Sequence, residues 1–271
     1  MNAYLLDLAL SFVVGGAWVL LASVAAERFG GKVGGFIAGL PATSVLAIFF
    51  ITYTEGARHG FDVTSVFPLA ISVNAVFLAV FAAFSRKSFS TGLRAALGVW
   101  ILAQFALAFI HPVHFGVVVA LGVVLFLGSL LFTGSLDIPD PGARSVRHGR
   151  VEIAVRAGSG GAVVVLSMLG SRLGGPLLGG ILSAFPATVV ATLVIAAAFG
   201  GKDLARTMAR PMMVSGVVNC LVFVLVYRQV VLHLPLLGAL ATAYAVTMAS
   251  AACTFYGMNV CRWNHARAIH T

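Results

Sequence analysis

The sequence predicts an all-α, polytopic membrane protein of about nine transmembrane helices, in which one linker helix joins two inverted four-helix repeats (4+1+4). Composition gives the membrane class, because 60% of the 271 residues are hydrophobic, 9% are charged and the mean hydropathy is +1.04. Soluble domains contain about a quarter charged residues. The other two observations are an internal duplication and an uneven distribution of basic residues.

A displacement of 145 positions, without gaps, maps the first part of the chain onto the second. The matched pairs are Asp7 and Glu152, Gly15-Gly16-Ala17 and Gly160-Gly161-Ala162, Gly30 and Gly175, Gly34-Gly35 and Gly179-Gly180, Pro41-Ala42-Thr43 and Pro186-Ala187-Thr188, and Val73-Asn74 and Val218-Asn219. Glycine and alanine coincide easily in an apolar chain. One fixed offset that also preserves proline, threonine, asparagine and an acidic position indicates a duplication.

Apolar runs of roughly 20 residues, the length that spans a bilayer, give the elements in order. They cover residues 3–26, 33–53, 63–84, 93–110, 115–133, 151–171, 177–199, 207–227 and 235–256. The predicted domains are a first repeat (1–112), a linker helix with its cytoplasmic loop (113–150), and a second repeat (151–271). Since the linker adds one unmatched span, the second repeat enters the membrane from the opposite face.

Basic residues predict the orientation, because Lys and Arg accumulate in cytoplasmic loops. With the N-terminus outside, the cytoplasmic side receives Arg28, Lys32, Arg86, Lys87, Arg94, Arg144, Arg147, Arg150, Lys202, Arg206, Arg210, Arg262 and Arg267, and the outside receives Arg58, Arg172 and Arg228. We therefore expect a multi-pass protein of the bacterial inner membrane with a cytoplasmic C-terminus. The net charge of +9 reflects this topology, with anionic lipids as neighbours and no nucleic-acid partner.

The stretch GGKVGGFIAGLPATSVLAIFFITYTEG (residues 30–56) has a glycine-rich approach, a turn at Pro41, an apolar helix and a Glu-Gly exit. It resembles the GlpM-like small inner-membrane proteins and a related uncharacterised bacterial membrane family, and the resemblance covers roughly residues 4–110. This resemblance implies a four-span unit, here duplicated and fused, and an association with exopolysaccharide (alginate) production. Gly200 replaces Glu55 in the second copy, so any role of that carboxylate is not duplicated.

The Pro-Ala-Thr turns are the first candidate site. Pro41 and Pro186 follow glycine-rich stretches inside apolar spans, and a proline there removes the helical donor of the carbonyl four residues earlier. We expect broken helices with the Thr43 and Thr188 hydroxyls at the breaks. Discontinuous helices at corresponding positions of two halves indicate a transport site, whereas a static kink stabilised by threonine is the alternative.

Two further symmetric sets complete the central candidate. Asn74 and Asn219 lie near the centres of spans 63–84 and 207–227, where an amide either contacts a substrate or links two helices. The glycine pairs Gly15-Gly16 and Gly160-Gly161 either permit close helix crossing or let a ligand reach backbone carbonyls.

Acidic residues in or near the spans are candidates for proton coupling or gating. Asp7 and Glu152 are expected in the first turns of their helices, where an acidic side chain is also favoured by the helix dipole alone. Glu55 ends the second span beside His59 and is expected to be solvated. His111 and His114 flank an outer turn but have no evident third metal ligand.

These observations predict an integral membrane transporter that moves a small or amphipathic solute through a central site without ATP hydrolysis. Two alternatives stay open: a passive channel of the same symmetry, and a non-transporting accessory or scaffold protein of envelope polysaccharide or lipid-precursor assembly. We expect no enzyme, cofactor or metal, because the spans contain no nucleotide-binding motif or catalytic constellation. Expected partners are membrane lipids and a small-molecule or lipid-like substrate, and the oligomeric state is not indicated.

Overall fold

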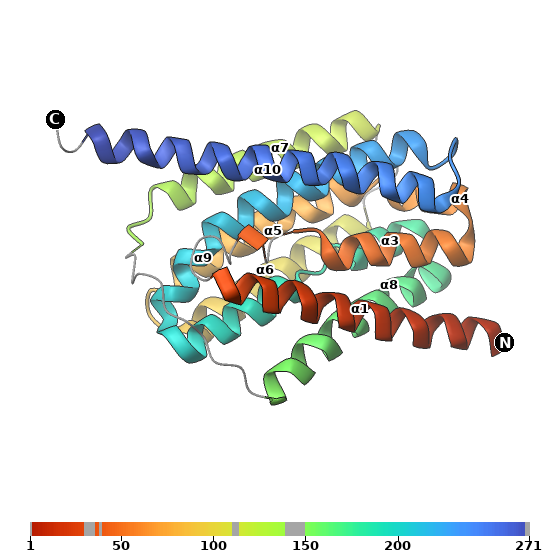
Figure 1. The fold of residues 1–271 in the computed structure, drawn as a ribbon, viewed down its shortest axis with the longest axis horizontal. Helices are drawn as coiled ribbons and strands as arrows, with labels where there is room; N and C mark the ends of the chain where they lie inside the picture. The colour runs from red at the N-terminus through yellow and green to blue at the C-terminus, as the bar shows by residue number, and fades with distance from the viewer. Residues whose placement is uncertain (1, 30–35, 38–39, 110–113, 139–149, 269–271) are drawn as a thin grey trace.

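The computed structural model describes residues 2–29, 36–37, 40–109, 114–138 and 150–268, and every long element in these ranges is a helix. The helices lie side by side in one bundle (Figure 1). They are α1 (Asn2–Phe29), α3 (Ala42–Glu55), α4 (Ala57–Val63), α5 (Phe67–Phe84), α6 (Phe89–Ala108), α7 (Phe115–Gly134), α8 (Arg150–Ser183), α9 (Ala187–Val230) and α10 (Leu236–Ala268).

Seven stretches of the described residues are helical, long and apolar enough to cross a membrane. One of them, Ala157–Ala198, has 42 residues, which would extend for about 63 Å at 1.5 Å per residue, twice the roughly 30 Å hydrocarbon core. It holds two predicted spans, because α8 turns at Gly175 and the chain leaves the helix between α8 and α9. The shorter apolar helix Thr43–Glu55 overlaps most of the second half of predicted span 33–53. The all-α, polytopic membrane class is confirmed.

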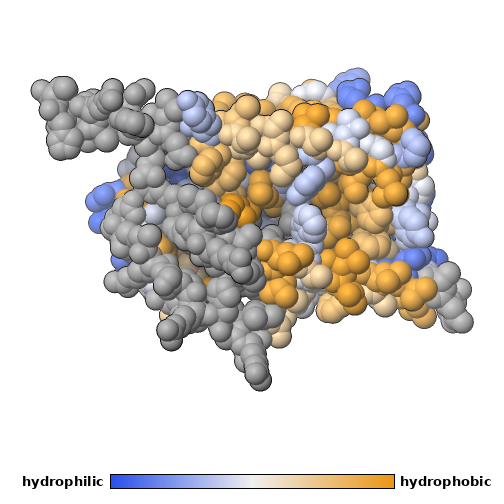
Figure 2. Space-filling model, in the orientation of Figure 1, coloured by the Kyte–Doolittle hydropathy of each residue, from blue (hydrophilic) through white to orange (hydrophobic). Residues whose placement is uncertain are grey.

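The surface of the bundle fits a lipid environment. Large apolar side chains are exposed on several helices, for example Leu102 of α6, Leu131 of α7 and Leu173 of α8. On the face seen in Figure 2, hydrophobic residues cover much of the middle, and the most hydrophilic residues lie near the two ends. In water such a surface would cost roughly 25 cal/mol per Å² of apolar area, whereas lipid tails solvate it.

The backbone repeats with the offset seen in the sequence. Pro41 has φ −75° and ψ 56° and precedes α3, while Pro186 has φ −82° and ψ 51° and precedes α9. Gly56 ends α3 with φ 92° and ψ 164°, and Gly201 bends α9 with φ 79° and ψ 173°. This region of backbone space is essentially restricted to glycine. The duplicated residues therefore adopt the same local conformations in both halves.

The two halves run in opposite directions. α1 leads away from the end of the bundle marked N, and α8 runs back toward that end (Figure 1). With the offset applied, α3 corresponds to the first part of α9, α4 and α5 correspond to the rest of α9, and α6 corresponds to α10. α7 has no counterpart among the described helices. The start of α1 and the end of α10 lie at opposite ends of the bundle (Figure 1).

The long second part of α9 separates two groups of basic residues. Lys202 and Arg228 are 26 residues apart on this helix, or about 39 Å at 1.5 Å per residue. At one end, Lys202 Nζ donates to the Arg86 carbonyl over 2.8 Å. At the other, Arg228 donates to the Phe61 carbonyl over 2.8 Å and lies 4.3 Å from the Phe115 ring centroid. Members of the expected cytoplasmic and outer sets thus lie at opposite ends.

The paired glycines bring α1 and α8 into close contact. A Cβ at Gly16 would lie 2.7 Å from the Ala157 carbonyl oxygen, and one at Gly15 would lie 3.4 Å from the Gly160 carbonyl oxygen. On α8, a Cβ at Gly160 or Gly161 would collide with α1. The close-crossing interpretation is confirmed, since any larger residue would push the two helices apart.

Candidate functional site

The helix breaks predicted at the two prolines are present. The carbonyl four residues before each proline, which has lost its helical donor, accepts a hydrogen bond from the residue just before the proline and so closes a tight turn. The Ile37 carbonyl accepts from the Leu40 amide over 3.1 Å, and the Leu182 carbonyl accepts from the Phe185 amide over 3.1 Å. These two turns are equivalent under the 145-residue offset. The sequence therefore satisfies the freed carbonyls locally, which buried backbone groups require.

The two breaks touch each other. The Ser44 hydroxyl, in the first turn of α3, donates to the Ser183 carbonyl at the end of α8 over 2.8 Å. This hydrogen bond joins residues that are 139 positions apart, and both of them are buried. The start of one broken helix is thus tied directly to the end of the other.

Asn74 of α5 binds the backbone of the second break, which lies between α8 and α9. Its Nδ2 donates to the Ala184 carbonyl over 2.9 Å, and its Oδ1 accepts from Trp100 Nε1 of α6 over 2.8 Å. The Trp100 ring also packs edge-on against Phe185, with 5.0 Å between ring centroids. The amide therefore uses both ends to link α5, α6 and the turn between α8 and α9.

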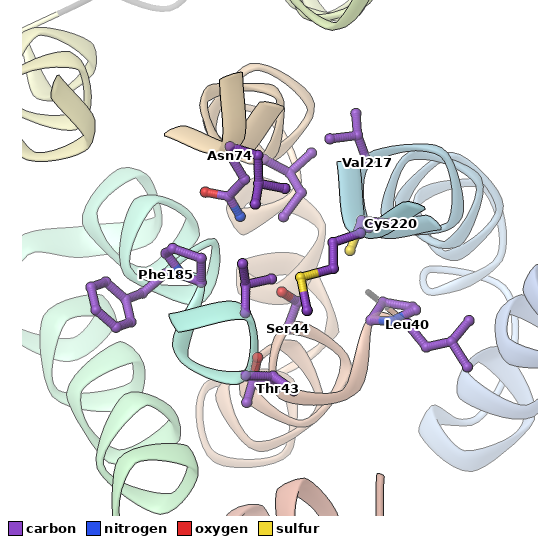
Figure 3. Close-up of a pocket in the computed structure, with 15 residues that line it drawn as sticks. Leu40, Thr43, Ser44, Asn74, Phe185, Val217 and Cys220 are labelled. Atoms are coloured by element: carbon purple, nitrogen blue, oxygen red, sulfur yellow. The ribbon is translucent and has the colours of Figure 1, made fainter. Parts of the chain in front are cut away.

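A cavity of about 40 Å³ lies where the breaks meet. Figure 3 shows its wall, with Thr43 and Ser44 from α3, Asn74 from α5, Phe185 from the turn, and Val217 and Cys220 from α9. The remaining lining residues are Leu40, Pro41, Ile71, Leu78, Pro186, Thr188, Val189, Met212 and Gly216. The wall is apolar apart from a few hydroxyl, amide and thiol groups and the backbone of the two breaks.

Both helices that begin at the cavity lack a side-chain cap. The first helical hydrogen bonds are donated by Val45 to the Pro41 carbonyl and by Val190 to the Pro186 carbonyl. The backbone N–H groups of the two preceding residues in each helix come before these bonds, so they have no partner within the helix. The positive ends of two helix dipoles therefore face one small cavity.

The predicted site residues divide into those that line the cavity and those that lie outside it. The cavity-lining ones are Pro41, Thr43, Asn74, Pro186 and Thr188. Thr188 is 5% exposed, and its hydroxyl has no hydrogen-bond partner among the described residues.

Asn219 departs from the expected symmetry. It is fully buried but is not among the cavity-lining residues. Its Nδ2 donates to Ser215 Oγ over 3.3 Å, and its Oδ1 has no partner among the described residues. The difference from Asn74 arises partly because Ala245 stands where the offset places the counterpart of Trp100. The four paired glycines, which pack α1 on α8, also lie outside the cavity wall.

Neither Asp7 nor Glu55 lines the cavity. The expectation of a first-turn position is wrong for Asp7, because α1 begins at Asn2 and carries no acidic residue in its first turn. Glu152 is the third residue of α8, but its side chain lies outside the described part of the chain, as does His111. Among the described residues, no group of three or more His, Cys, Asp or Glu could hold a metal ion.

Glu55 is paired, and the expectation that it is solvated is wrong. Its Oε2 lies 3.2 Å from His59 Nε2, the Glu55 side chain is 18% exposed, and the same histidine nitrogen is 2.8 Å from Ser171 Oγ of α8. The helical spacing of four residues brings the two side chains onto one face. This cluster lies at the opposite end of α3 from the cavity.

Three side chains at this site were missed from the sequence: Ser44 and Cys220, which line the cavity, and Trp100, which bonds Asn74 from behind the wall. Ser44, Trp100 and Cys220 have Val189, Ala245 and Ala75 at the equivalent positions, so a search for repeated polar residues passes over them. A different signal was available, because hydroxyl and indole groups inside apolar spans require partners.

A comparison with protein families matches residues 8–113 to a family described as a protein of unknown function (DUF3147). The matched stretch runs from α1 to just before α7, as the predicted first repeat does. No curated protein and no solved structure gives a significant match. Residues 8–113 are therefore similar to a family whose description assigns no activity.

Proposed function

We propose that this protein is a membrane transporter in which two inverted repeats move a small solute through the cavity between the helix breaks, without ATP hydrolysis. The observation that carries the proposal is the contact between the two breaks, where the Ser44 hydroxyl of the first repeat bonds the Ser183 carbonyl of the second. Non-helical backbone at membrane depth is tolerated only when it is buried or lines a cavity. Both conditions hold here.

The arrangement matches what alternating access requires. Paired discontinuous helices place free backbone groups near the midplane, and the two halves move against each other around that site. Gly56 and Gly201 end the first helical segment beyond each break in glycine-specific conformations. We propose that these positions are hinges, since a Cβ built at either glycine meets nothing within 4 Å and packing does not hold them.

The different hydrogen bonds of Asn74 and Asn219 suggest how the two halves could exchange conformations. Asn74 binds the break of the second repeat, whereas Asn219 binds no backbone carbonyl among the described residues. In the exchanged state, we propose that Asn74 releases the Ala184 carbonyl and that Asn219 bonds the break of the first repeat. The structure would then represent one of two states that face opposite sides of the membrane.

We further propose the bacterial inner membrane as the location, with the N-terminus outside and the C-terminus in the cytoplasm. The bias of basic residues toward one set of loops supports this orientation. Membrane lipids would cover the exposed apolar side chains of α6, α7 and α10. The similarity of residues 8–113 to an uncharacterised family is compatible with this proposal and does not specify a substrate.

The experiment is solute flux into liposomes that contain the purified full chain. A panel of labelled small solutes, including inorganic anions, amino acids, sugars and short organic acids, is compared with protein-free liposomes. Pro186→Ala returns an amide donor to the turn, and Asn219→Leu removes the proposed partner of the exchanged state. Both variants are expected to lower flux of the transported solute at least tenfold, whereas Gly98→Ala, which fills open space on α6, is expected to leave it unchanged.

Three outcomes count against the proposal. Flux that rises linearly with solute concentration without saturating indicates a passive channel. The absence of flux for every solute, with correctly folded protein, favours the accessory role in envelope assembly that the GlpM-like resemblance suggests. Normal flux in Pro186→Ala and Asn219→Leu would show that transport depends neither on the helix break at Pro186 nor on the Asn219 side chain.

A further inference from the structure

We infer that the central cavity binds a small monovalent anion, held by the Thr188 hydroxyl and by backbone N–H groups at the starts of α3 and α9. This inference rests on the proposed function and specifies the substrate class of that site. It follows from the charge at the cavity, from the hydrogen-bonding groups left over there, and from the size of the space.

The charge at the cavity comes from the backbone. None of the fifteen described residues that line it is Asp, Glu, Lys, Arg or His. Each helix N-terminus contributes about half a positive elementary charge, so α3 and α9 together supply roughly one. Anions bind readily at such termini. One positive charge in an apolar wall suits a monovalent anion and disfavours cations and multivalent anions.

The hydrogen-bonding groups that remain free at the cavity also favour an anion, because they are donors. Four carbonyls near the breaks, of Ile37, Leu182, Ser183 and Ala184, already accept hydrogen bonds. The amides of Thr43, Ser44, Thr188 and Val189 precede the first helical hydrogen bond in their helices. The unfilled capacity at the breaks is therefore mainly that of donors, and a ligand that satisfies it must accept hydrogen bonds.

Thr188 is the independent indication of a ligand. It is 5% exposed, lines the cavity, and its hydroxyl has no partner among the described residues. Thr192, one turn later on the same helix, is also buried but donates to the Thr188 carbonyl over 2.7 Å. A buried hydroxyl without a partner is costly, and an anion in the cavity would accept its hydrogen bond.

The space limits the ligand to a few atoms. A cavity needs roughly 10–15 Å³ to hold one water molecule, and this cavity has about 40 Å³. A halide, nitrate or formate ion fits this volume, whereas a sugar or a lipid headgroup does not.

The test measures binding by the full chain in detergent. The midpoint of thermal unfolding is titrated with sodium bromide and sodium nitrate against sodium gluconate at constant ionic strength. A ligand that binds the folded state raises the midpoint in a saturable way. We expect saturable stabilisation by bromide and nitrate and none by gluconate, an anion too large for the cavity.

Matched variants assign the site. Thr188→Val keeps the side-chain shape and removes only the hydroxyl, so the half-saturating concentration is expected to rise about tenfold or more. Thr192→Val is the control and is expected to change it less than about twofold. Crystals of the wild-type chain in bromide are expected to show an anomalous peak in the cavity, which decides the matter even if Thr188→Val does not fold.

The results separate this inference from the proposed function. No saturable stabilisation, an equal response in Thr188→Val, or no bromide peak in the cavity would overturn the anion site. Binding without bromide or nitrate flux in liposomes would keep the site and overturn transport. Saturable flux of another solute without anion binding would keep transport and overturn the site.

Discussion

Replacement of Asn74 by leucine should destabilise the protein, and the same change at Asn219 should not. Asn74→Leu removes two buried hydrogen bonds, from Nδ2 to the Ala184 carbonyl and from Trp100 Nε1 to Oδ1. Hydrogen bonds between transmembrane helices average about 0.6 kcal/mol and reach about 1.7 kcal/mol. Two of them, with two buried groups left unpaired, give an expected loss of about 1–3 kcal/mol in the free energy of unfolding.

Asn219→Leu is the matched control for the same substitution. Asn219 makes one long hydrogen bond, 3.3 Å to Ser215 Oγ, and its Oδ1 has no partner among the described residues. Its replacement is expected to change the free energy of unfolding by less than about 0.5 kcal/mol. The assay is reversible unfolding in mixed micelles followed by tryptophan fluorescence. Equal losses at the two positions, or a neutral Asn74→Leu, would refute the assignment of Asn74 as the residue that closes the second break.

Three further predictions test the fold. Gly201→Ala should cost about 1–2 kcal/mol, because φ 79° strains any other residue; unfolding in mixed micelles measures this, and Gly98→Ala on the open side of α6 should be neutral or stabilising. Gly16→Ala should destabilise by about 1–3 kcal/mol through overpacking against α8, while Gly158→Ala, which meets nothing within 4 Å, should not; equal effects would refute the close crossing. Reporter tags at the N-terminus and after Thr271 should report opposite compartments, and reporters on the same side would overturn the odd number of spans.

The repeated features of the fold could be predicted because they repeat. One offset predicted that Pro186 would behave as Pro41 does, and the backbone angles at the two prolines agree within a few degrees. Glycine pairs at equal depth predicted a close crossing of the first and sixth spans, which α1 and α8 provide. These outcomes depend on local backbone conformation and on residue size, and both follow from the residue types themselves.

The contacts that complete the site do not repeat, and the sequence did not predict them. Ser44 and Trp100 acquire their roles from partners on the other half or on another helix, and their equivalents are Val189 and Ala245. The pairing of Glu55 with His59 was also missed, because solvation was inferred from a position at the end of a span. In each case the deciding factor is tertiary: which side chain the packing brings within reach of an unpaired group.

The central claim is that the cavity between the breaks opens in turn to each side of the membrane, and Cys220 is a native reporter for it. Cys220 lines the cavity and is buried in the described state, and a thiol reacts only where solvent reaches it. With Cys253 and Cys261 replaced by alanine, a membrane-impermeant thiol reagent is applied separately to each face of oriented vesicles. The account predicts labelling of Cys220 from both faces, at rates that Pro186→Ala lowers. Labelling from neither face, with full labelling after unfolding, would contradict it.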